Sequence, residues 1–168
     1  MEISIKSLVL LVTVMLTGLS AGLFYAWSVS VIPGTQKVVD AVYLQTMQQI
    51  NRAILNPAFF LVYFGALVFL FASSFSFYGT NRAIFWMLLA AATMYLIGTV
   101  GVTGLGNVPL NNQLEKLDLS KINSEEMGAF RRYYESKWNR LHLIRTVFAC
   151  CAFFAAATAV CFSIKINP

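Results

Sequence analysis

The feature that most constrains this chain is the distribution of its charged residues. Four long stretches hold no Asp, Glu, Lys or Arg, and they are residues 7–36, 53–81, 83–114 and 146–164. A charge at the centre of a bilayer costs about 2.5–3.5 kcal/mol on insertion scales. A helix of about 20 apolar residues spans the hydrocarbon core. We therefore expect residues 1–168 to form a single integral membrane domain.

The composition supports a multi-pass membrane protein and argues against a nucleic-acid-binding one. Charged residues make up 11% of the chain, whereas a soluble domain has about 25%. The net charge is +5, but the basic residues flank the apolar stretches, which favours contact with the headgroups of the lipid bilayer. We expect no nucleic-acid partner. The expected location is a membrane, and the cell membrane if the source is bacterial.

The pattern predicts an all-α fold, a four-transmembrane-helix antiparallel bundle. Start and stop signals place the membrane helices at about 7–32, 57–77, 83–105 and 141–164. Between the first two, residues 36–52 place apolar side chains roughly on one helical face and polar ones elsewhere. This segment is predicted to be an amphipathic helix in the first loop, lying along the surface or folded over the mouth of the bundle.

Glycine, proline and asparagine mark the expected ends and breaks of these helices. Pro33 with the glycine after it is predicted to end the first helix, and Asn56 followed by proline to begin the second. Residues 106–112 contain Gly, Pro and three Asn, so they are not expected to form a regular helix. They should lie at the rim of the bundle or dip into it. A helical extension starting near Ser124 is predicted to continue into the last helix.

Small residues recur at intervals that suit close helix packing in lipid. They form two stripes, which are Gly18, Gly22, Ala26 and Ser30 on the first helix and Gly98, Gly101 and Gly104 on the third. We expect neighbouring helices to approach closely along both stripes.

The start of the last membrane helix carries an unusual set of polar side chains. At 100° per residue, one face presents Trp138, Asn139, His142 and Arg145. Arg145 lies one turn inside the helix, where an unpaired guanidinium is costly, so it must snorkel, pair or face a polar cavity. Two interpretations stay open: an interfacial anchor with Trp138 as a belt residue, or a polar site at the mouth of the bundle.

Other polar residues on the same side are candidates to line that site, and these are Trp27, Asn56, Asn107 and Asn111. His142 is the only histidine. A metal site that needs two histidines therefore cannot form within one chain, and we expect no metal. A haem held by His142 alone stays open, although no motif supports it. As a general base, His142 would need burial and a partner.

Four ordered motifs resemble those of the anthrone oxygenase family, whose members are integral membrane proteins. They are AGLFYAWSVSVIPG at 21–34, MQQINRAILNP at 47–57, NVPLNN at 107–112 and WNRLHLIRT at 138–146. Together they extend over nearly the whole chain. The resemblance implies a four-helix membrane protein.

The resemblance also implies a reaction, the oxidation of an anthrone methylene to a quinone carbonyl by O₂. In that reaction His142 would be the base, and Arg145 with Asn107 or Asn139 would stabilise the oxyanion. The carbanion can reduce O₂ directly, so no cofactor is expected. The partner is a hydrophobic small molecule, and a homo-oligomer stays open. The alternative is a non-enzymatic membrane protein that binds a lipid, a quinone or a partner subunit.

Overall fold

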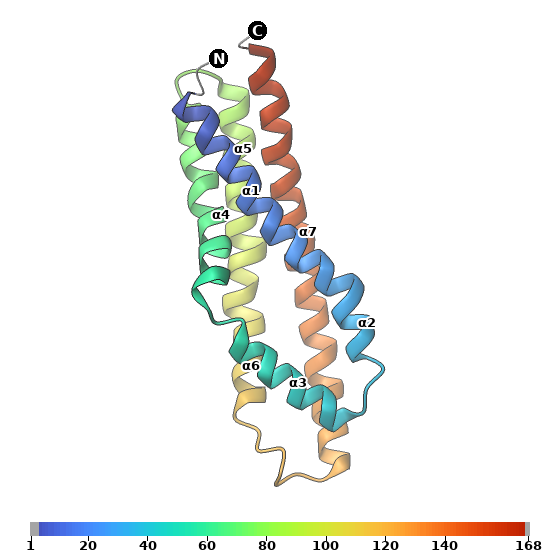
Figure 1. The fold of residues 1–168 in the computed structure, drawn as a ribbon. Coiled ribbons are helices and arrows are strands. Elements are labelled where there is room, and N and C mark those ends of the chain that lie inside the picture. The colour runs from blue at the N-terminus through green and yellow to red at the C-terminus, as the bar shows by residue number, and fades with distance from the viewer. Residues whose placement is uncertain (1–3, 167–168) are drawn as a thin grey trace.

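The computed structural model describes residues 4–166 as an elongated bundle of helices (Figure 1). Within this part of the chain, four helices are long and apolar enough to cross a membrane, and they are Ile5–Thr35, Pro57–Ser76, Arg82–Glu115 and Ser124–Ser163. The start of the first and the end of the last lie at the same end of the molecule (Figure 1). The predicted all-α fold with four membrane helices is confirmed.

The first and third of these long helices are composed of shorter elements, three of them π-helical, whereas the second and fourth are each one α-helix. In chain order the elements are α1 (Ile5–Ala26), η1 (Trp27–Val31), α2 (Ile32–Thr35), α3 (Asp40–Ala53), α4 (Pro57–Ser76), α5 (Arg82–Met94), η2 (Tyr95–Gly101), η3 (Thr103–Asn107), α6 (Val108–Glu115) and α7 (Ser124–Ile166). The amphipathic helix expected in the first loop is α3. The expected extension before the last membrane helix is the first part of α7.

Asparagine side chains determine where three of the helices begin. Asn56 and Asn81 each accept a hydrogen bond at 3.0 Å from the backbone N–H three residues further on, at the starts of α4 and α5. At the start of α7, Asn123 and Glu126 exchange two such bonds at 2.9 Å. These caps satisfy amide groups that a helix start leaves without a partner.

Two expected breaks in helical structure are wrong. The first helix continues past Pro33 to Thr35, and residues 106–112 are helical as the end of η3 and the start of α6. A proline ring normally collides with the carbonyl four residues earlier in an α-helix. Pro33 and Pro109 are the second residues of α2 and α6, and each of these helices directly follows a π-helical segment. The wider π turn displaces that carbonyl, so the helix can continue.

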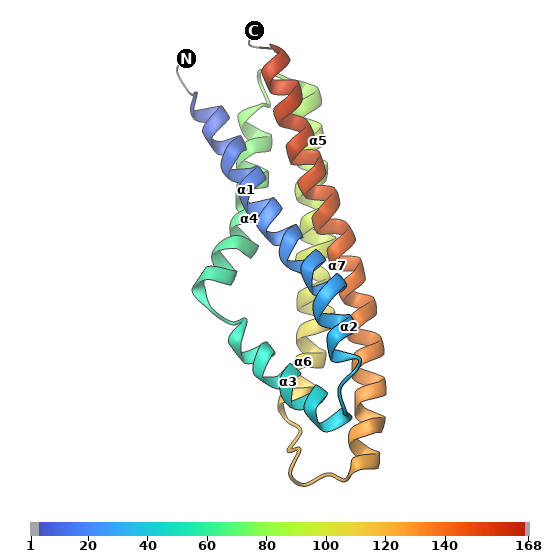
Figure 2. The ribbon, with the colours of Figure 1, turned by 45° about the vertical axis from the view of Figure 1, so that its right-hand side comes forward.

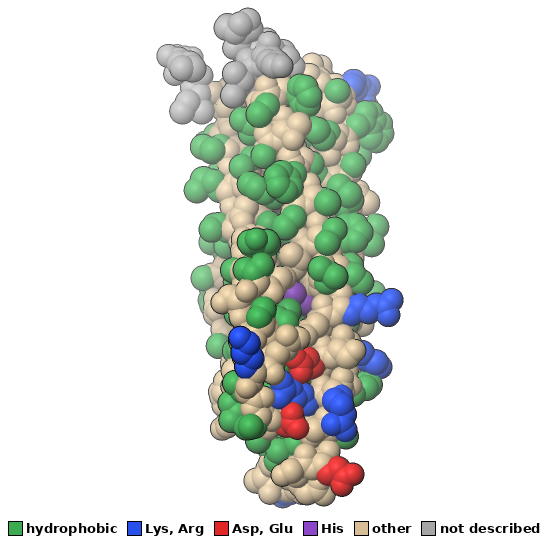
Figure 3. Space-filling view, turned by 90° about the vertical axis from the view of Figure 1, so that its right-hand side faces the viewer, with side chains coloured by type: hydrophobic (Ala, Val, Ile, Leu, Met, Phe, Trp, Pro, Cys, Tyr) green, Lys and Arg blue, Asp and Glu red, His purple; other side chains and the backbone are tan. Residues whose placement is uncertain are grey.

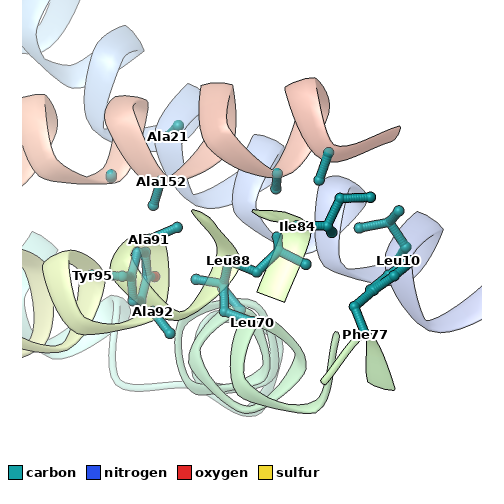
Figure 4. Packing of buried hydrophobic residues seen from close by; sticks show 14 of the residues in the cluster. Leu10, Ala21, Leu70, Phe77, Ile84, Leu88, Ala91, Ala92, Tyr95 and Ala152 are labelled. Atoms are coloured by element: carbon teal, nitrogen blue, oxygen red, sulfur yellow. The ribbon is translucent and has the colours of Figure 1, made fainter. Parts of the chain in front are cut away.

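Alanines allow α5 and α7 to pack closely in the main core. Ala91, Ala92 and Ala152 are completely buried there, and Figure 4 shows them beside Leu88 and Tyr95. Short side chains let two backbones approach, which supplies van der Waals contact where the hydrophobic effect between helices is absent. A second, smaller core lies at the end of the molecule where α3 is, and it holds residues from α3, α6 and α7.

The glycine stripes contribute to packing at fewer positions than expected. A Cβ at Gly98 would collide with the ring of Phe148, and one at Gly18 would lie 3.1 Å from Phe153. Gly22 and Gly104, in contrast, have no neighbouring atom within 4 Å of such a Cβ. The expected close approach along both stripes is therefore wrong at these two glycines, and it holds at Gly18 and Gly98. A sequence period identifies a helix face but not which neighbour it meets.

The charged side chains gather mainly at the end of the molecule that holds α3 and the first part of α7 (Figure 3). Arg131 on α7 is the centre of this region. Its guanidinium bonds Asp40 at 3.0 Å, Glu135 at 2.9 Å and the carbonyl of Val38 at 2.7 Å. It also lies over the ring of Tyr43, 4.4 Å from the centroid. These contacts hold α3 across the end of the bundle.

Candidate functional site

A cavity of about 480 Å³ lies between the long helices on the side covered by α3. Its walls come from α1, η1, the end of α3, the start of α4, η2, η3, α6 and α7, and from the residues that join α3 to α4. Most of the lining is apolar and aromatic. The polar groups Asn107, His142 and Arg145 gather in one region of the wall.

His142 is buried and held in one tautomer. Its Nε2 lies 3.1 Å from the carbonyl oxygen of Phe24, and its Nδ1 lies 3.0 Å from Nη2 of Arg145. A carbonyl can only accept and a guanidinium can only donate. Nε2 therefore carries the proton, and Nδ1 accepts. The ring also stacks on Trp138, with centroids 5.1 Å apart and planes 8° from parallel.

Arg145 is a buried cation without an acidic partner. It is 7% exposed, and it forms no ion pair with any carboxylate in the described part of the chain. Nη1 donates to the hydroxyl of Thr103 at 3.3 Å, and Nε has no partner. The guanidinium carbon lies 5.1 Å and 5.2 Å from the ring centroids of Phe24 and Trp138. Aromatic faces attract a cation but do not neutralise it.

Two asparagines also contribute polar groups to the wall. Asn107 is 1% exposed, and its Nδ2 donates to the carbonyl of Trp138 at 3.4 Å while its Oδ1 has no partner. Asn111 Oδ1 accepts two bonds at 3.0 Å, from the Trp138 indole and from the Tyr134 hydroxyl. Asn111 therefore fixes the indole on which His142 stacks. Asn107 keeps an unused acceptor beside the cavity.

The π-helical segments coincide with this site. Trp27 and Ser28 belong to η1, and Thr103 and Asn107 belong to η3. Ser28 Oγ lies 3.0 Å from Nε2 of His142. Short π segments within α-helices occur frequently at functional sites, because they redirect side chains at a cost in helix regularity. Their position here is an independent sign that the cavity matters for function.

The structure brings together most of the predicted site residues but not all of them. Those that line the cavity are Trp27, Asn107, Asn111, Trp138, His142 and Arg145. Asn139 is half-buried and does not line it. Asn56 caps α4 and donates to the carbonyl of Ala53 at 2.9 Å, and it is also absent from the lining.

Sequence analysis missed several of the groups that contact the polar residues. Phe24, Tyr63 and Thr103 line the cavity, and two of them had a usable signal. Phe24 lies three residues before Trp27, and Thr103 lies four residues before Asn107, so each shares a helical face with a predicted site residue. Among the described residues, no group of three or more His, Cys, Asp or Glu side chains is placed to hold a metal ion.

One comparison with known proteins gave a match. A family model described as anthrone oxygenase matches residues 59–155, more than half of the chain. The matched region contains Asn107, Trp138, His142 and Arg145, and it excludes the contributions of α1, η1 and α3 to the cavity. The comparisons with curated proteins and with solved structures gave no match.

Proposed function

Because this chain belongs to the anthrone oxygenase family, we propose that it is an oxygenase that acts on an anthrone-like aromatic molecule in the membrane. The family match and the four long apolar helices show a multi-pass membrane protein. The activity, the substrate and the roles of individual residues are the proposal. One observation carries it, the buried Arg145 guanidinium that faces an aromatic cavity without an acidic partner.

Such a cation suits a substrate on which negative charge develops. Removing one proton from the methylene of an anthrone gives a carbanion whose charge is delocalised onto the carbonyl oxygen. A guanidinium in a water-poor cavity stabilises that oxyanion far more than it would in water. Arg145 takes this role. The unpaired Oδ1 of Asn107 can accept a hydrogen bond from a hydroxyl on the same substrate.

The overall reaction balances without another reductant. The methylene carbon loses its two hydrogens, one atom of O₂ becomes the new carbonyl oxygen, and the other atom leaves as water with those hydrogens. The carbanion passes one electron to O₂, the two radicals join through a new C–O bond, and the O–O bond then breaks. Two electron pairs leave the C–H bonds, and O₂ accepts all four electrons.

His142 is the proposed base, and its hydrogen bond to Arg145 must break before it can accept a proton. The lone pair of Nδ1 is already used at 3.0 Å by Nη2 of Arg145. When the substrate oxygen attracts Arg145, that bond breaks and Nδ1 becomes free to take the methylene proton. The base is thus available only in a cavity that holds an oxygen-bearing ligand. Catalytic hydrogen bonds are often arranged differently before substrate binds.

The same hydrogen bond favours a second candidate function, binding without turnover. If Arg145 never leaves Nδ1 of His142, the cavity holds a neutral quinone or a similar carbonyl compound and performs no proton transfer. This is the non-enzymatic alternative to an oxygenase.

Oxygen uptake by the purified protein with an anthrone distinguishes the two functions. Anthrones oxidise slowly by themselves, so the rate is compared with a protein-free sample. We expect His142→Gln to lower the catalysed rate by about 10²–10⁴-fold, and Arg145→Gln by about 10²–10³-fold. Arg140→Gln, at an exposed position of the same helix, should keep the wild-type rate. A wild-type rate equal to the protein-free rate would exclude the oxygenase.

A further inference from the structure

We propose that the cavity opens sideways into the bilayer between α1 and α4, and that its ligand arrives from the lipid phase. The inference rests on the proposed function for the identity of the ligand, a flat apolar aromatic molecule that carries a polar oxygen. It concerns a different property, the route by which the ligand reaches Arg145.

The lining of one side of the cavity is exposed on the outer surface of the bundle. Leu23 on α1 is 39% exposed, and Phe60 and Phe64 on α4 are 40% and 47% exposed. All three belong to helices that are long and apolar enough to cross a membrane. His142 and Arg145 line the same cavity and are 1% and 7% exposed. One continuous space therefore connects a lipid-facing surface with the buried polar groups.

The arrangement of the helices agrees with this opening. α1 and α4 lie close together near their shared end and separate towards α3, where the cavity lies (Figure 2). In the described part of the chain, the hydrogen bonds between α1 and α4 all involve Thr13, which lies almost three turns from Leu23. Near Leu23 and Phe64 the polar link between these helices is indirect, because the buried Tyr95 hydroxyl bonds both Ser20 on α1 and the carbonyl of Tyr63 on α4. Among the described residues, no direct hydrogen bond joins α1 to α4 at that level.

On the side that faces the charged end of the molecule, the cavity is closed by an ion pair. Arg52 on α3 and Glu115 on α6 both line the cavity and form an ion pair, with Nη2 2.8 Å from Oε1 and Nε 2.9 Å from the same oxygen. This pair joins α3 to α6 across the rim. An apolar ligand would have to leave the lipid and pass a charged pair to use that side, whereas the α1–α4 side offers only hydrocarbon and aromatic surfaces.

Binding kinetics of a stable ligand test the route. The probe is a dihydroxyanthraquinone, which O₂ does not oxidise, and its own visible fluorescence reports binding to protein in liposomes. We expect Leu23→Trp or Phe64→Trp to slow both association and dissociation about tenfold, because a bulky side chain in a portal obstructs both directions equally. The dissociation constant should then change less than about twofold.

Matched variants control for the added bulk. Leu19→Trp and Val68→Trp place the same side chain on the same helices, one turn from the portal, at exposed positions that do not line the cavity. These two should bind the probe at wild-type rates. Thermal unfolding confirms that each variant is folded, and Phe60→Trp serves as a further portal variant if one fails.

Two outcomes would overturn the proposal. One is unchanged kinetics in all portal variants together with faster association in Arg52→Ala, which would place the route at the charged rim. The other is weaker binding with no slowing of dissociation, which would mean that the tryptophan only fills the cavity. Because the probe is not oxidised, absence of oxygen uptake would refute the proposed oxygenase and leave this result unaffected.

Discussion

Replacement of Arg145 by methionine tests whether this cation serves ligand binding or the stability of the fold. Methionine keeps much of the unbranched stem and removes the charge. The change relieves the penalty of an uncompensated buried ion, several kcal/mol. It also removes the two bonds to Thr103 and His142, each worth about 1.5–3 kcal/mol when one partner is charged. The two effects nearly cancel, so we expect the free energy of unfolding to change by less than about 2 kcal/mol.

Arg131→Met is the matched control, because this arginine is also buried but is paired with Asp40 and Glu135. Breaking a buried ion pair leaves a carboxylate without its partner and typically costs about 3–5 kcal/mol. Reversible unfolding in mixed detergent micelles measures both variants.

Ligand-induced stabilisation supplies the functional half of the test. A ligand at 100 times its dissociation constant stabilises the folded state by about 2.7 kcal/mol. Wild type and Arg131→Met should show this gain with the dihydroxyanthraquinone, and Arg145→Met should lose most of it. If Arg145→Met instead unfolds as easily as Arg131→Met and still gains the full stabilisation, Arg145 is a structural cross-link and the reasoning is refuted.

Two further predictions concern the frame around the site. Gly98→Ala should lower the free energy of unfolding by about 1–3 kcal/mol, because its methyl group would overlap Phe148. Gly22→Ala is the control and should not lower it, because the space around Gly22 is open. Equal effects of the two variants in thermal unfolding would contradict the packing. Asn111→Leu removes the acceptor shared by the indole of Trp138 and the hydroxyl of Tyr134. It should cost about 1–3 kcal/mol and raise indole mobility, and unchanged tryptophan fluorescence anisotropy would count against that role.

The sequence predicted the number and type of the long helices because bilayer insertion is dominated by one quantity, the cost of charge in hydrocarbon. The predicted break in the helix at residues 106–112 was wrong for a physical reason. Asn, Gly and Pro favour turns in water, but in an apolar environment a broken helix leaves backbone groups without partners. The chain instead keeps its helix and absorbs Pro109 through the π turn of η3.

The part of the candidate site on α7 was predictable from the helical period alone. The 100° rule places Trp138, His142 and Arg145 on one face of α7, and all three line the cavity. Asn139 was assigned to the same face, at its edge 100° from Trp138, and it does not line the cavity. The bond between His142 and the carbonyl of Phe24 joins residues far apart in the chain. No local period can predict such a contact, because it depends on how two helices are placed against each other.

The position of His142 along α7 indicates how deep the site would lie in a bilayer. This helix is 43 residues long, or about 64 Å at 1.5 Å per residue, roughly twice the thickness of a hydrocarbon core. His142 lies 24 residues before its end at Ile166, about 36 Å along the axis. With that end at one face of the membrane, the imidazole reaches the opposite headgroup layer. An amphiphilic molecule dissolved among the lipids places its polar end in that same layer, so it can present its oxygen to Arg145 without turning over or leaving its preferred depth.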